Sequence, residues 1–341
     1  MNNLISDNKK SALICGISGQ DGSFLAQFLL QKGYTVYGSS RDAETASFRN
    51  LRHLGIYDKV IKLSIASSDF RSVLQALKQI NPDEIYNLAG QTSVGLSFEQ
   101  PVETFDSITV GTLNFLEAIR FLGIKSKFYN AASSECFGNT DNLPANEKTP
   151  FKPRSPYAVA KAAAFWQVAN YREAYQLFAC SGILFNHESI LRPSRFVTQK
   201  IITAVHQIQQ GKQKSLNLGN LSIQRDWGWA PDFVEVMWLM LQQENPEDFV
   251  IGTGRTHSLQ YFVQRAFECA QLNWKEHVIQ DSNITRPTDL EISRCDPSKA
   301  NEILGWHAKV YIEEIVDRMY RGCLDPVNSF TNSYIFPSDS P

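Results

Sequence analysis

The sequence predicts an α/β protein in which a doubly wound parallel sheet of the Rossmann type is joined to a smaller C-terminal α/β substrate-binding domain. From Ser11 to about Asn186, short apolar runs alternate with longer amphipathic ones, as expected for strands joined by crossover helices. The first apolar run leads directly into a glycine-rich turn. After Asn186 the alternation becomes irregular, which indicates that a second unit begins there.

The elements of the first part follow one another in a regular order. The apolar runs have the length of buried strands, and the runs between them have apolar residues at helical spacing. Strands are expected at 12–17, 35–40, 84–90, 127–133 and 179–186, and helices at 23–33, 70–80, 109–123 and 156–176. We expect the parallel sheet to be essentially complete by about Asn186.

The second part contains shorter elements. A helix is expected at 196–212, a short strand at 215–220 and a helix at 298–305. The amphipathic segment 232–243 can return to pack on the first domain. The predicted organisation is a Rossmann domain over 1–186 with a return of about 225–255, a second domain over mainly 187–324, and a polar tail over 325–341.

Composition and charge favour a small-molecule partner. The net charge of -2 gives no electrostatic reason to bind nucleic acid or a membrane surface. The N-terminal segment lacks the apolar core of a signal peptide, and no later segment has the length and apolarity of a membrane span. The six cysteines lie far apart, with no CxxC pair and no histidine at ligand spacing, so reduced thiols and no metal site are expected. We therefore expect a cytoplasmic protein.

The turn after the first strand contains Gly16, Gly19 and Gly22 and is followed by a helix. Gly16 permits a tight turn, Gly19 lets a pyrophosphate approach the backbone, and Gly22 allows close packing of helix on strand. The turn therefore predicts a dinucleotide site, and the alternative is a glycine-rich turn without a ligand.

The end of the second strand indicates which dinucleotide is bound. An acid here would hold the ribose 2'-hydroxyl of NAD, but the chain has Ser39, Ser40 and Arg41. Hydroxyls and a guanidinium suit a 2'-phosphate, so NADP is the expected cofactor. The alternative is that Arg41 is an ordinary loop arginine.

Tyr157 and Lys161 open a helix after Pro156. Their spacing places the phenol and the ammonium on one helix face, where Lys161 can lower the pKa of the tyrosine and bind the nicotinamide ribose. An amphipathic helix that happens to carry a tyrosine and a lysine is the alternative. Together with the glycine turn and a serine at the end of the intervening strand, Ser133 or Ser134, the pair resembles the extended short-chain dehydrogenase/reductase superfamily.

Glu135 is an acid in the otherwise apolar and small run "NAASSECFG". Members of this superfamily that only oxidise and re-reduce C4 of a nucleotide sugar usually have a small or apolar residue two positions after the catalytic hydroxyl. A carboxylate there can take the proton from C5 of a 4-keto sugar and help expel the 6-hydroxyl.

The chain from about Ser11 to Tyr320 resembles the GDP-mannose 4,6-dehydratase family. The motifs that carry the resemblance are "GQDGSFLAQFLLQKGY", "PDEIYNLAGQ", "TPFKPRSPYAVAKAAAFW", "GILFNHES", "FVTQKI", "RDWGWAPDFVEVMWLMLQQ" and "DPSKANEILGW". Few families share that set.

The resemblance implies a hydro-lyase with a closed redox cycle. Tyr157 takes the proton from O4 while hydride leaves C4 for NADP, Glu135 removes the C5 proton, and water is lost across C5 and C6. The hydride then returns to C6 and leaves a 4-keto-6-deoxy sugar. The runner-up is a 4-epimerase or a 4-ketosugar reductase of the same fold, neither of which needs a base at C5. A catalytically inactive redox sensor or scaffold is a third reading, but such proteins usually lose the tyrosine or the lysine.

The resemblance also implies the binding residues. Catalysis is assigned to Ser133, Glu135, Tyr157 and Lys161. Cofactor binding is assigned to Gly16, Ser18, Gly19, Gln20, Asp21, Gly22, Arg41, Ser64, Leu88, Ala89, Gln91, Tyr157, Lys161, His187 and Arg192. Binding of the GDP-sugar is assigned to Ser93, Ser133, Asn186, Phe196, Val197, Lys200, Gly219, Arg225, Arg286 and Asp289, of which Arg225 and Arg286 match contacts to the diphosphate.

The chain departs from the family pattern in three places. After Arg41 it has Asp42–Thr45 where the family usually has a second arginine and serines, and this loop commonly reaches a neighbouring subunit. This change argues against a tetramer formed through the loop, so both a homodimer and a homotetramer stay open. Ser64 replaces a usual aspartate near the adenine. The loop Ile190–Arg195 is also altered, which leaves a GDP-manno-heptose open as the substrate beside GDP-mannose.

Overall fold

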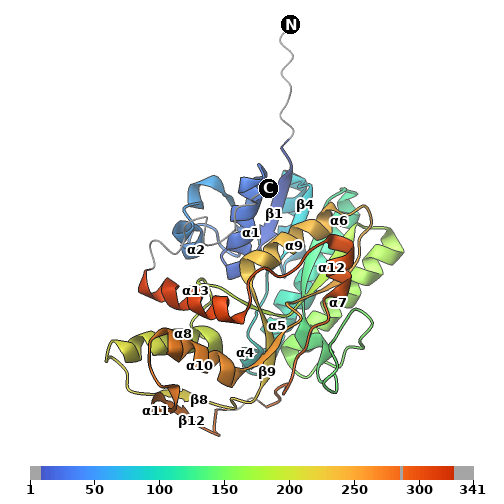
Figure 1. Ribbon diagram of the computed structural model, residues 1–341. Helices are drawn as coiled ribbons and strands as arrows, with labels where there is room; N and C mark the ends of the chain where they lie inside the picture. The colour runs from blue at the N-terminus through green and yellow to red at the C-terminus, as the bar shows by residue number, and fades with distance from the viewer. Residues whose placement is uncertain (1–8, 285–286, 326–341) are drawn as a thin grey trace.

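The computed structural model describes residues 9–284 and 287–325 of the chain. A seven-stranded sheet in which all neighbouring strands are parallel lies at its centre, in the order β10-β6-β5-β4-β1-β2-β3 (Figure 1). The strands are β1 (Ser11–Cys15), β2 (Thr35–Ser40), β3 (Ile61–Ser64), β4 (Glu84–Asn87), β5 (Lys127–Ser133), β6 (Ala179–Leu184) and β10 (Phe249–Ile251). The order reverses between β1 and β4, which confirms the doubly wound sheet and defines its ligand-binding edge.

Helices cover both faces of this sheet. They are α1 (Gln20–Gln31), α2 (Arg49–His53), α3 (Phe70–Ile80), α4 (Val94–Glu99), α5 (Pro101–Phe105), α6 (Gly111–Leu122), α7 (Pro156–Tyr175), α9 (Ala230–Gln242) and α12 (Ser298–Leu304). A π-helical segment, Asp106–Val110, joins α5 to α6, and 3-10 turns lie at Tyr57–Lys59 and Ser134–Phe137.

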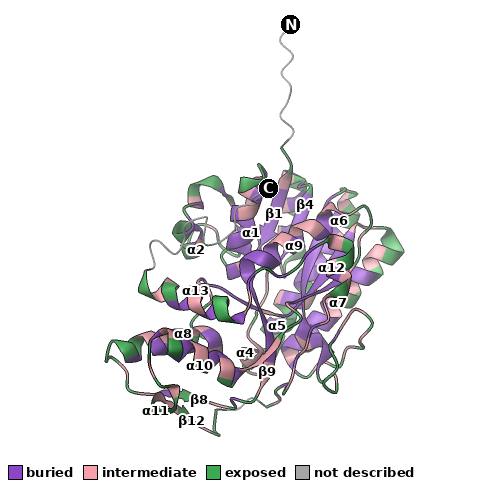
Figure 2. Cartoon of the chain, in the orientation of Figure 1, coloured by how far each residue is buried: buried purple, intermediate pink, exposed green. Residues whose placement is uncertain are grey.

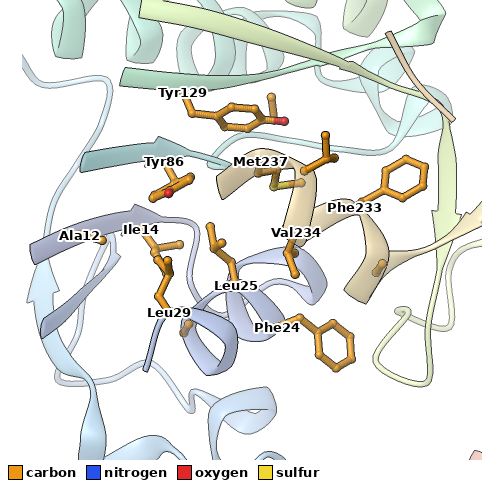
Figure 3. Close-up of a cluster of buried hydrophobic side chains, with 14 of the residues drawn as sticks. Ala12, Ile14, Phe24, Leu25, Leu29, Tyr86, Tyr129, Phe233, Val234 and Met237 are labelled. Atoms are coloured by element: carbon orange, nitrogen blue, oxygen red, sulfur yellow. The ribbon is translucent and has the colours of Figure 1, made fainter. Parts of the chain in front are cut away.

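Side chains of the strands alternate between two separate apolar layers. Ala12 and Ile14 of β1 pack with α1 and α9 in the layer that Figure 3 shows, together with Tyr86 and Tyr129 of the neighbouring strands. Leu13 points to the other face, where α3, α6 and α7 pack. Figure 2 shows the strands and the inner sides of the helices as buried. The central strands are therefore covered on both faces, as a parallel sheet requires.

The seventh strand corrects one expectation. The sheet is not complete at Asn186, because β10 adds to its edge beside β6 after α9 has packed on α1. Only three residues of β10 are extended, and so short a run has no periodicity that sequence analysis could use. The proposed division at residue 186, with its return of about 225–255, stays a prediction.

A smaller region lies beyond the carboxyl edge of the sheet, in the lower part of Figure 1. It contains the three-stranded sheet β11-β9-β7 and the pair β12-β8. Its elements are β7 (Asn186–Glu188), α8 (Val197–Gln209), β8 (Leu216–Leu218), β9 (Gln224–Trp229), β11 (Thr256–Ser258), α10 (Leu259–Cys269), α11 (Trp274–His277), β12 (Val278–Gln280) and α13 (Ile312–Leu324). Helices α8, α10 and α13 share an apolar core of their own.

Buried polar contacts join the two regions where the chain passes between them. Asp226 of β9 accepts hydrogen bonds from Thr253 N at 3.0 Å and Gly254 N at 2.8 Å, just after β10. Burial raises the pKa of Asp226 to about 6, although these hydrogen bonds oppose the shift. Phe185 N, between β6 and β7, donates to Ile251 O at 2.9 Å. The chain is therefore held side by side at three passages: the link from β6 to β7, the end of β10 and the start of β9.

Three further expectations concern membrane spans, cysteines and metal sites. No helix among the described residues is long and apolar enough to cross a membrane. The six cysteines are free thiols, and four of them are buried. The same part of the chain contains no cluster of three or more histidine, cysteine, aspartate or glutamate residues placed to hold a metal ion. Arg286 and residues 326–341 of the predicted tail lie outside the described residues.

Candidate active site

The glycine turn between β1 and α1 leaves no room for side chains. Gly16 has φ of +80°, and a Cβ there would lie 2.9 Å from Leu88 O. A Cβ on Gly22 would lie 2.5 Å from Gly16 O, so this glycine is what lets α1 pack against the end of β1. Gly19 caps α1 without a side-chain hydrogen bond, which leaves backbone N–H groups of the first turn open to an anion. The cradle fits the pyrophosphate of a dinucleotide.

Side chains around this turn connect it to its neighbours. Ser18 O accepts a hydrogen bond from Asn50 Nδ2 at 2.9 Å. Gln20 is buried and donates from Nε2 to His187 O at 3.2 Å, while Ser189 Oγ donates to Gln20 Oε1 at 2.7 Å. Gln20 thus ties the start of α1 to β7 and the residue that follows it.

The other predicted cofactor positions lie at or just after the carboxyl ends of β2 to β4. Arg41 is exposed, and its Nη1 lies 3.5 Å from Glu103 Oε1. Ser64 Oγ accepts from Ala43 N at 2.9 Å, so it supports the loop after Arg41. Beyond β4, Ala89 N lies 3.0 Å from the position of a Gly16 Cβ, and Gln91 Nε2 donates to Ser93 O at 2.8 Å.

The four predicted catalytic residues line one cavity. Ser133 ends β5, Glu135 lies in the 3-10 turn that follows, and Tyr157 and Lys161 lie in the first turns of α7. Helix α7 begins sharply because Ser155 Oγ accepts from Ala158 N at 3.1 Å and Pro156 occupies the first turn.

Burial shifts the pKa values of Lys161 and Tyr157. It lowers the pKa of Lys161 to about 8, and Lys161 Nζ donates to Ala131 O at 2.6 Å. Burial also raises the pKa of Tyr157, while a hydrogen bond with Ser133 and the charge of Arg192 act in the opposite direction. Glu135 is half-buried, and its backbone N donates to Ser133 Oγ at 3.3 Å. A base, a hydroxyl and a carboxylate are therefore gathered where a substrate can reach them.

A second wall of the cavity comes from β7, the loop after it and the start of α8. His187 Nε2 lies 3.0 Å from Asp21 Oδ2. Arg192 Nε lies 3.1 Å from Glu188 Oε2 in an ion pair that lacks hydrogen-bond geometry, and its guanidinium carbon lies 3.8 Å from the centre of the Phe196 ring.

Arg225 of β9 completes the cavity. It is 5% exposed, and its Nη2 lies 3.1 Å from Asp289 Oδ1. Two other predicted substrate positions lie nearby but do not line the cavity. Lys200 Nζ donates to Asn217 O at 2.9 Å, and a Cβ on Gly219 would lie 2.4 Å from Ile284 O.

The family model described as GDP-mannose 4,6 dehydratase matches residues 13–319. The chain belongs to the GDP-mannose 4,6-dehydratase family. GDP-mannose 4,6 dehydratase 1 of Arabidopsis thaliana is 47% identical over 321 residues, which cover 91% of this chain and 89% of that protein. GDP-mannose 4,6-dehydratase of Vibrio cholerae serotype O1 is 41% identical over 356 residues, which cover 94% and 95%. The prediction of a hydro-lyase of this family is confirmed.

Solved structures confirm the predicted fold of this GDP-mannose 4,6-dehydratase family member. UDP-glucose 4-epimerase of Thermus thermophilus, in complex with NAD, has a TM-score of 0.79 and 26% identity, with 92% of this chain and 99% of that chain covered. DesIV, a dTDP-glucose 4,6-dehydratase of Streptomyces venezuelae with NAD and TYD bound, has a TM-score of 0.81 and 19% identity, with 91% and 96% covered.

The structure brings many of the predicted site residues of this GDP-mannose 4,6-dehydratase family member together. Those that line the cavity are Asp21, Leu88, Ser93, Ser133, Glu135, Tyr157, Lys161, Asn186, His187, Arg192, Phe196, Val197 and Arg225. The remaining described positions lie outside its lining: Gly16, Ser18, Gly19, Gln20, Gly22, Arg41, Ser64, Ala89, Gln91, Lys200, Gly219 and Asp289.

The cavity also contains residues that sequence analysis did not assign to it. Thr92, Glu188, Thr198 and Trp227 line it, each directly beside or close to an assigned residue. Arg195, noted only as part of the altered loop, lines it too and donates from Nη2 to Thr92 Oγ1 at 3.4 Å. The signal for most of them was adjacency to a motif residue, which is weak because neighbouring residues often point in opposite directions.

Proposed function

We propose that the protein catalyses the NADP-dependent 4,6-dehydration of a GDP-manno-sugar to the GDP-4-keto-6-deoxy sugar. The observation that carries this proposal is that Glu135 shares one cavity with Ser133, Tyr157 and Lys161. A 4-epimerase or a 4-ketosugar reductase would use Ser133, Tyr157 and Lys161, but neither reaction removes the C5 proton, so neither needs the Glu135 carboxylate.

Several features of the second wall support a nucleoside diphosphate sugar as substrate. The start of α8 faces the cavity through Phe196, Val197 and Thr198, and no side chain caps it, so its first N–H groups can receive a phosphate. Arg192, Arg195 and Arg225 line the same space. Guanidinium groups at a helix N-terminus suit the two charges of a diphosphate.

The glycine cradle and the ends of β2 and β3 support the cofactor. Gly16, Gly19 and Gly22 would hold the pyrophosphate. Strand β2 ends in serines with no acid, and the exposed Arg41 that follows them would bind a 2'-phosphate. When bound, NADP supplies an acceptor for the hydride of C4 and later returns that hydride to C6.

The proton steps fall to residues of this chain. Ser133 holds O4 of the sugar, and Tyr157 as phenolate takes the O4 proton. Burial raises the pKa of this phenol, and the groups that act toward the phenolate are the hydrogen bond of Ser133 and the charge of Arg192, with Lys161 Nζ 5.9 Å from the ring centre. Glu135 then takes the proton from C5, which the new C4 carbonyl acidifies, and gives a proton to the departing 6-hydroxyl. Each of these groups is buried or half-buried, so solvent competes little for the protons.

Replacement of Glu135 tests the reaction. Purified protein incubated with GDP-mannose and no added reductant should yield a product lighter by one water, measured by mass spectrometry. Glu135→Gln should abolish the loss of water and leave NADP binding intact, because the amide keeps the shape and cannot take a proton. Glu173→Gln, on the exposed side of α7, is the matched control. Normal dehydration by Glu135→Gln would contradict the proposed mechanism.

The altered loop favours a GDP-manno-heptose as the second candidate substrate. Arg192 and Arg195 of Ile190–Arg195 line the cavity, so changes in this loop act directly on the space available to the sugar. The heptose carries a larger substituent at C6 and undergoes the same chemistry. Equal or better turnover of GDP-mannose than of the heptose in matched assays would rule out the heptose preference.

We also propose a cytoplasmic homodimer or homotetramer. Free thiols suit a reducing compartment. Helices α5 and α6 each pack on α7, and Val102, Phe121 and Trp166 of these helices are each more than 60% accessible. Large apolar side chains exposed on packed helices support contact with a second copy. Light scattering should show an oligomer for the wild type and a smaller species for Phe121→Glu.

A further inference from the structure

One wall of the cavity holds four ionisable side chains that are largely shielded from solvent. Asp21 at the start of α1, His187 and Glu188 of β7, and Arg192 of the loop after β7 all line it. His187 is 8% exposed and Glu188 is 1% exposed. They form two ion pairs, His187 with Asp21 at 3.0 Å and Arg192 with Glu188 at 3.1 Å.

Both ring nitrogens of His187 face oxygen acceptors. Nδ1 lies 2.8 Å from Phe185 O, and a carbonyl oxygen can only accept. Nε2 lies 3.0 Å from Asp21 Oδ2. If Asp21 is ionised, each nitrogen must carry a proton and the ring is an imidazolium. The Phe233 ring, stacked at 4.4 Å between centroids, also suits a cation.

The surroundings favour an ionised Asp21. Burial raises the pKa of this carboxyl, but the charge and hydrogen bond of His187, the hydrogen bond of Gln20 and the charge of Arg192 together outweigh burial and lower it. For His187, burial lowers the pKa, while Asp21 and the carbonyl of Phe185 raise it above its ordinary value despite the repulsion of Arg192.

When His187 is protonated, its charge and that of Arg192 balance the two carboxylates of Asp21 and Glu188, so this wall carries no net charge. Without that proton, the carboxylate of Asp21 would lose its ion-pair partner, and the cations left near it would be Lys161 and Arg192, which already pairs with Glu188. Burial raises the pKa of Glu188 and of Tyr157, and the charge of Arg192 opposes that rise in both, as it does for Asp21. A neutral His187 would therefore set the two carboxylates in competition for one guanidinium.

We propose that His187 is a positioning residue that acts as an imidazolium: paired with Asp21, it keeps the wall neutral and leaves Arg192 with Glu188, where its charge favours the phenolate of Tyr157. The consequence for turnover rests on the proposed function, whereas the charge state of the ring does not.

Nuclear magnetic resonance of the full-length protein labelled with 15N-histidine tests the charge state directly. The chain has six histidines, and His187→Gln identifies the signals of His187 by their loss. We expect both ring nitrogens of His187 to show imidazolium shifts at pH 7.5, whereas the exposed His53, whose pKa is lowered by burial and by Arg49, is the neutral reference. Shifts of a neutral tautomer would overturn the proposal. The measurement needs no turnover, so it decides even if GDP-mannose is not converted.

Turnover of a variant that lacks the imidazolium tests the role. His187→Gln leaves Asp21 without its ion-pair partner and in competition with Glu188 for Arg192, so we expect turnover to fall about tenfold. Asp21→Asn/His187→Gln also removes the competing carboxylate, so Arg192 stays with Glu188 and most of the lost turnover should return. Asp296→Asn, which removes a carboxylate outside the cavity lining, should show no such fall.

The double variant separates the charge of His187 from the shape of its ring. The comparison is made at pH 6.5, below the pKa of Lys161, because Asp21 also raises that pKa. If turnover stays low in Asp21→Asn/His187→Gln, the fall comes from the missing ring and the proposed role is wrong.

Discussion

The two walls of the cavity hold their side chains in different ways. On the wall of β5 and α7, Ser133, Tyr157 and Lys161 project from a strand end and from a capped helix, so the backbone fixes their positions. On the wall of β7 and α8, the strand has three residues and the loop after it carries the arginines. There Arg192 and Arg195 are positioned by other side chains, Glu188, Phe196 and Thr92.

This difference suggests how one reaction can be kept while its substrate changes. Groups fixed by the backbone keep the distances that proton transfer requires. Groups held by side chains can be exchanged by a few substitutions without loss of the fold. Of the altered loop Ile190–Arg195, Arg192 and Arg195 line the second wall.

The largest effect is expected on the first wall. Tyr157→Phe removes one oxygen and leaves the ring packed, so we expect turnover to fall about a thousandfold with the affinity for GDP-mannose almost unchanged. Tyr171→Phe on the same helix, whose hydroxyl donates to Glu117 at 2.9 Å, is the control. Steady-state kinetics measure both. A fall of less than about tenfold in Tyr157→Phe would show that another group accepts the proton.

The pH profile of the wild type should reflect the same wall. Burial lowers the pKa of Lys161 to about 8, so its ammonium loses the proton as pH rises through that value. Since the cation is needed beside Tyr157, we expect turnover to fall about tenfold per pH unit above pH 8. If turnover instead stays constant from pH 8 toward the ordinary pKa of lysine, the charge of Lys161 is not needed for catalysis.

The close packing of Gly22 against the end of β1 leads to a prediction about stability. In Gly22→Ala the new Cβ would lie 2.5 Å from Gly16 O and 2.7 Å from Ile17 Cα, so α1 must move away from the end of β1. We expect a loss of about 1–3 kcal/mol in the free energy of unfolding and weaker NADP binding. Gly95→Ala, whose Cβ meets nothing closer than 4.0 Å, is the control in denaturant unfolding. Equal stability of the two variants would mean that the cradle adjusts freely.

The smallest effect is expected on the second wall. Arg195 is exposed and makes a 3.4 Å hydrogen bond, so Arg195→Ala should raise KM for GDP-mannose by no more than about fivefold and leave kcat unchanged. If the loop selects the sugar as proposed, the effect of this variant on turnover of the heptose should differ, because Arg195 lines the same cavity as Glu135. Arg255→Ala, outside the cavity lining, is the control. A large fall in kcat would place Arg195 in the chemistry and remove the contrast between the walls.

The same contrast explains what sequence analysis could predict. The glycine turn and the spacing of Tyr157 and Lys161 are local patterns, and local patterns determine where a backbone-held group points. The contact of Arg195 with Thr92 joins residues 103 positions apart, and no period in the sequence encodes it. For β10, the three strand residues become a strand only because the edge of β6 is free to pair with them. The domain boundary and the roles of the site residues stay predictions.

The contacts between the three chain passages also restrict how the cavity can open. Asp226 holds the start of β9 to Thr253 and Gly254, and Phe185 is bonded to Ile251 beside it. Pulling the smaller region straight away from the sheet would break these buried bonds at once. A rotation of the smaller region would in addition have to break the contacts of Gln20 with His187 and Ser189 and of Asp21 with His187. The hydrogen bond of Arg195 with Thr92, at 3.4 Å between two exposed side chains, is the contact at this cavity that can be broken most easily.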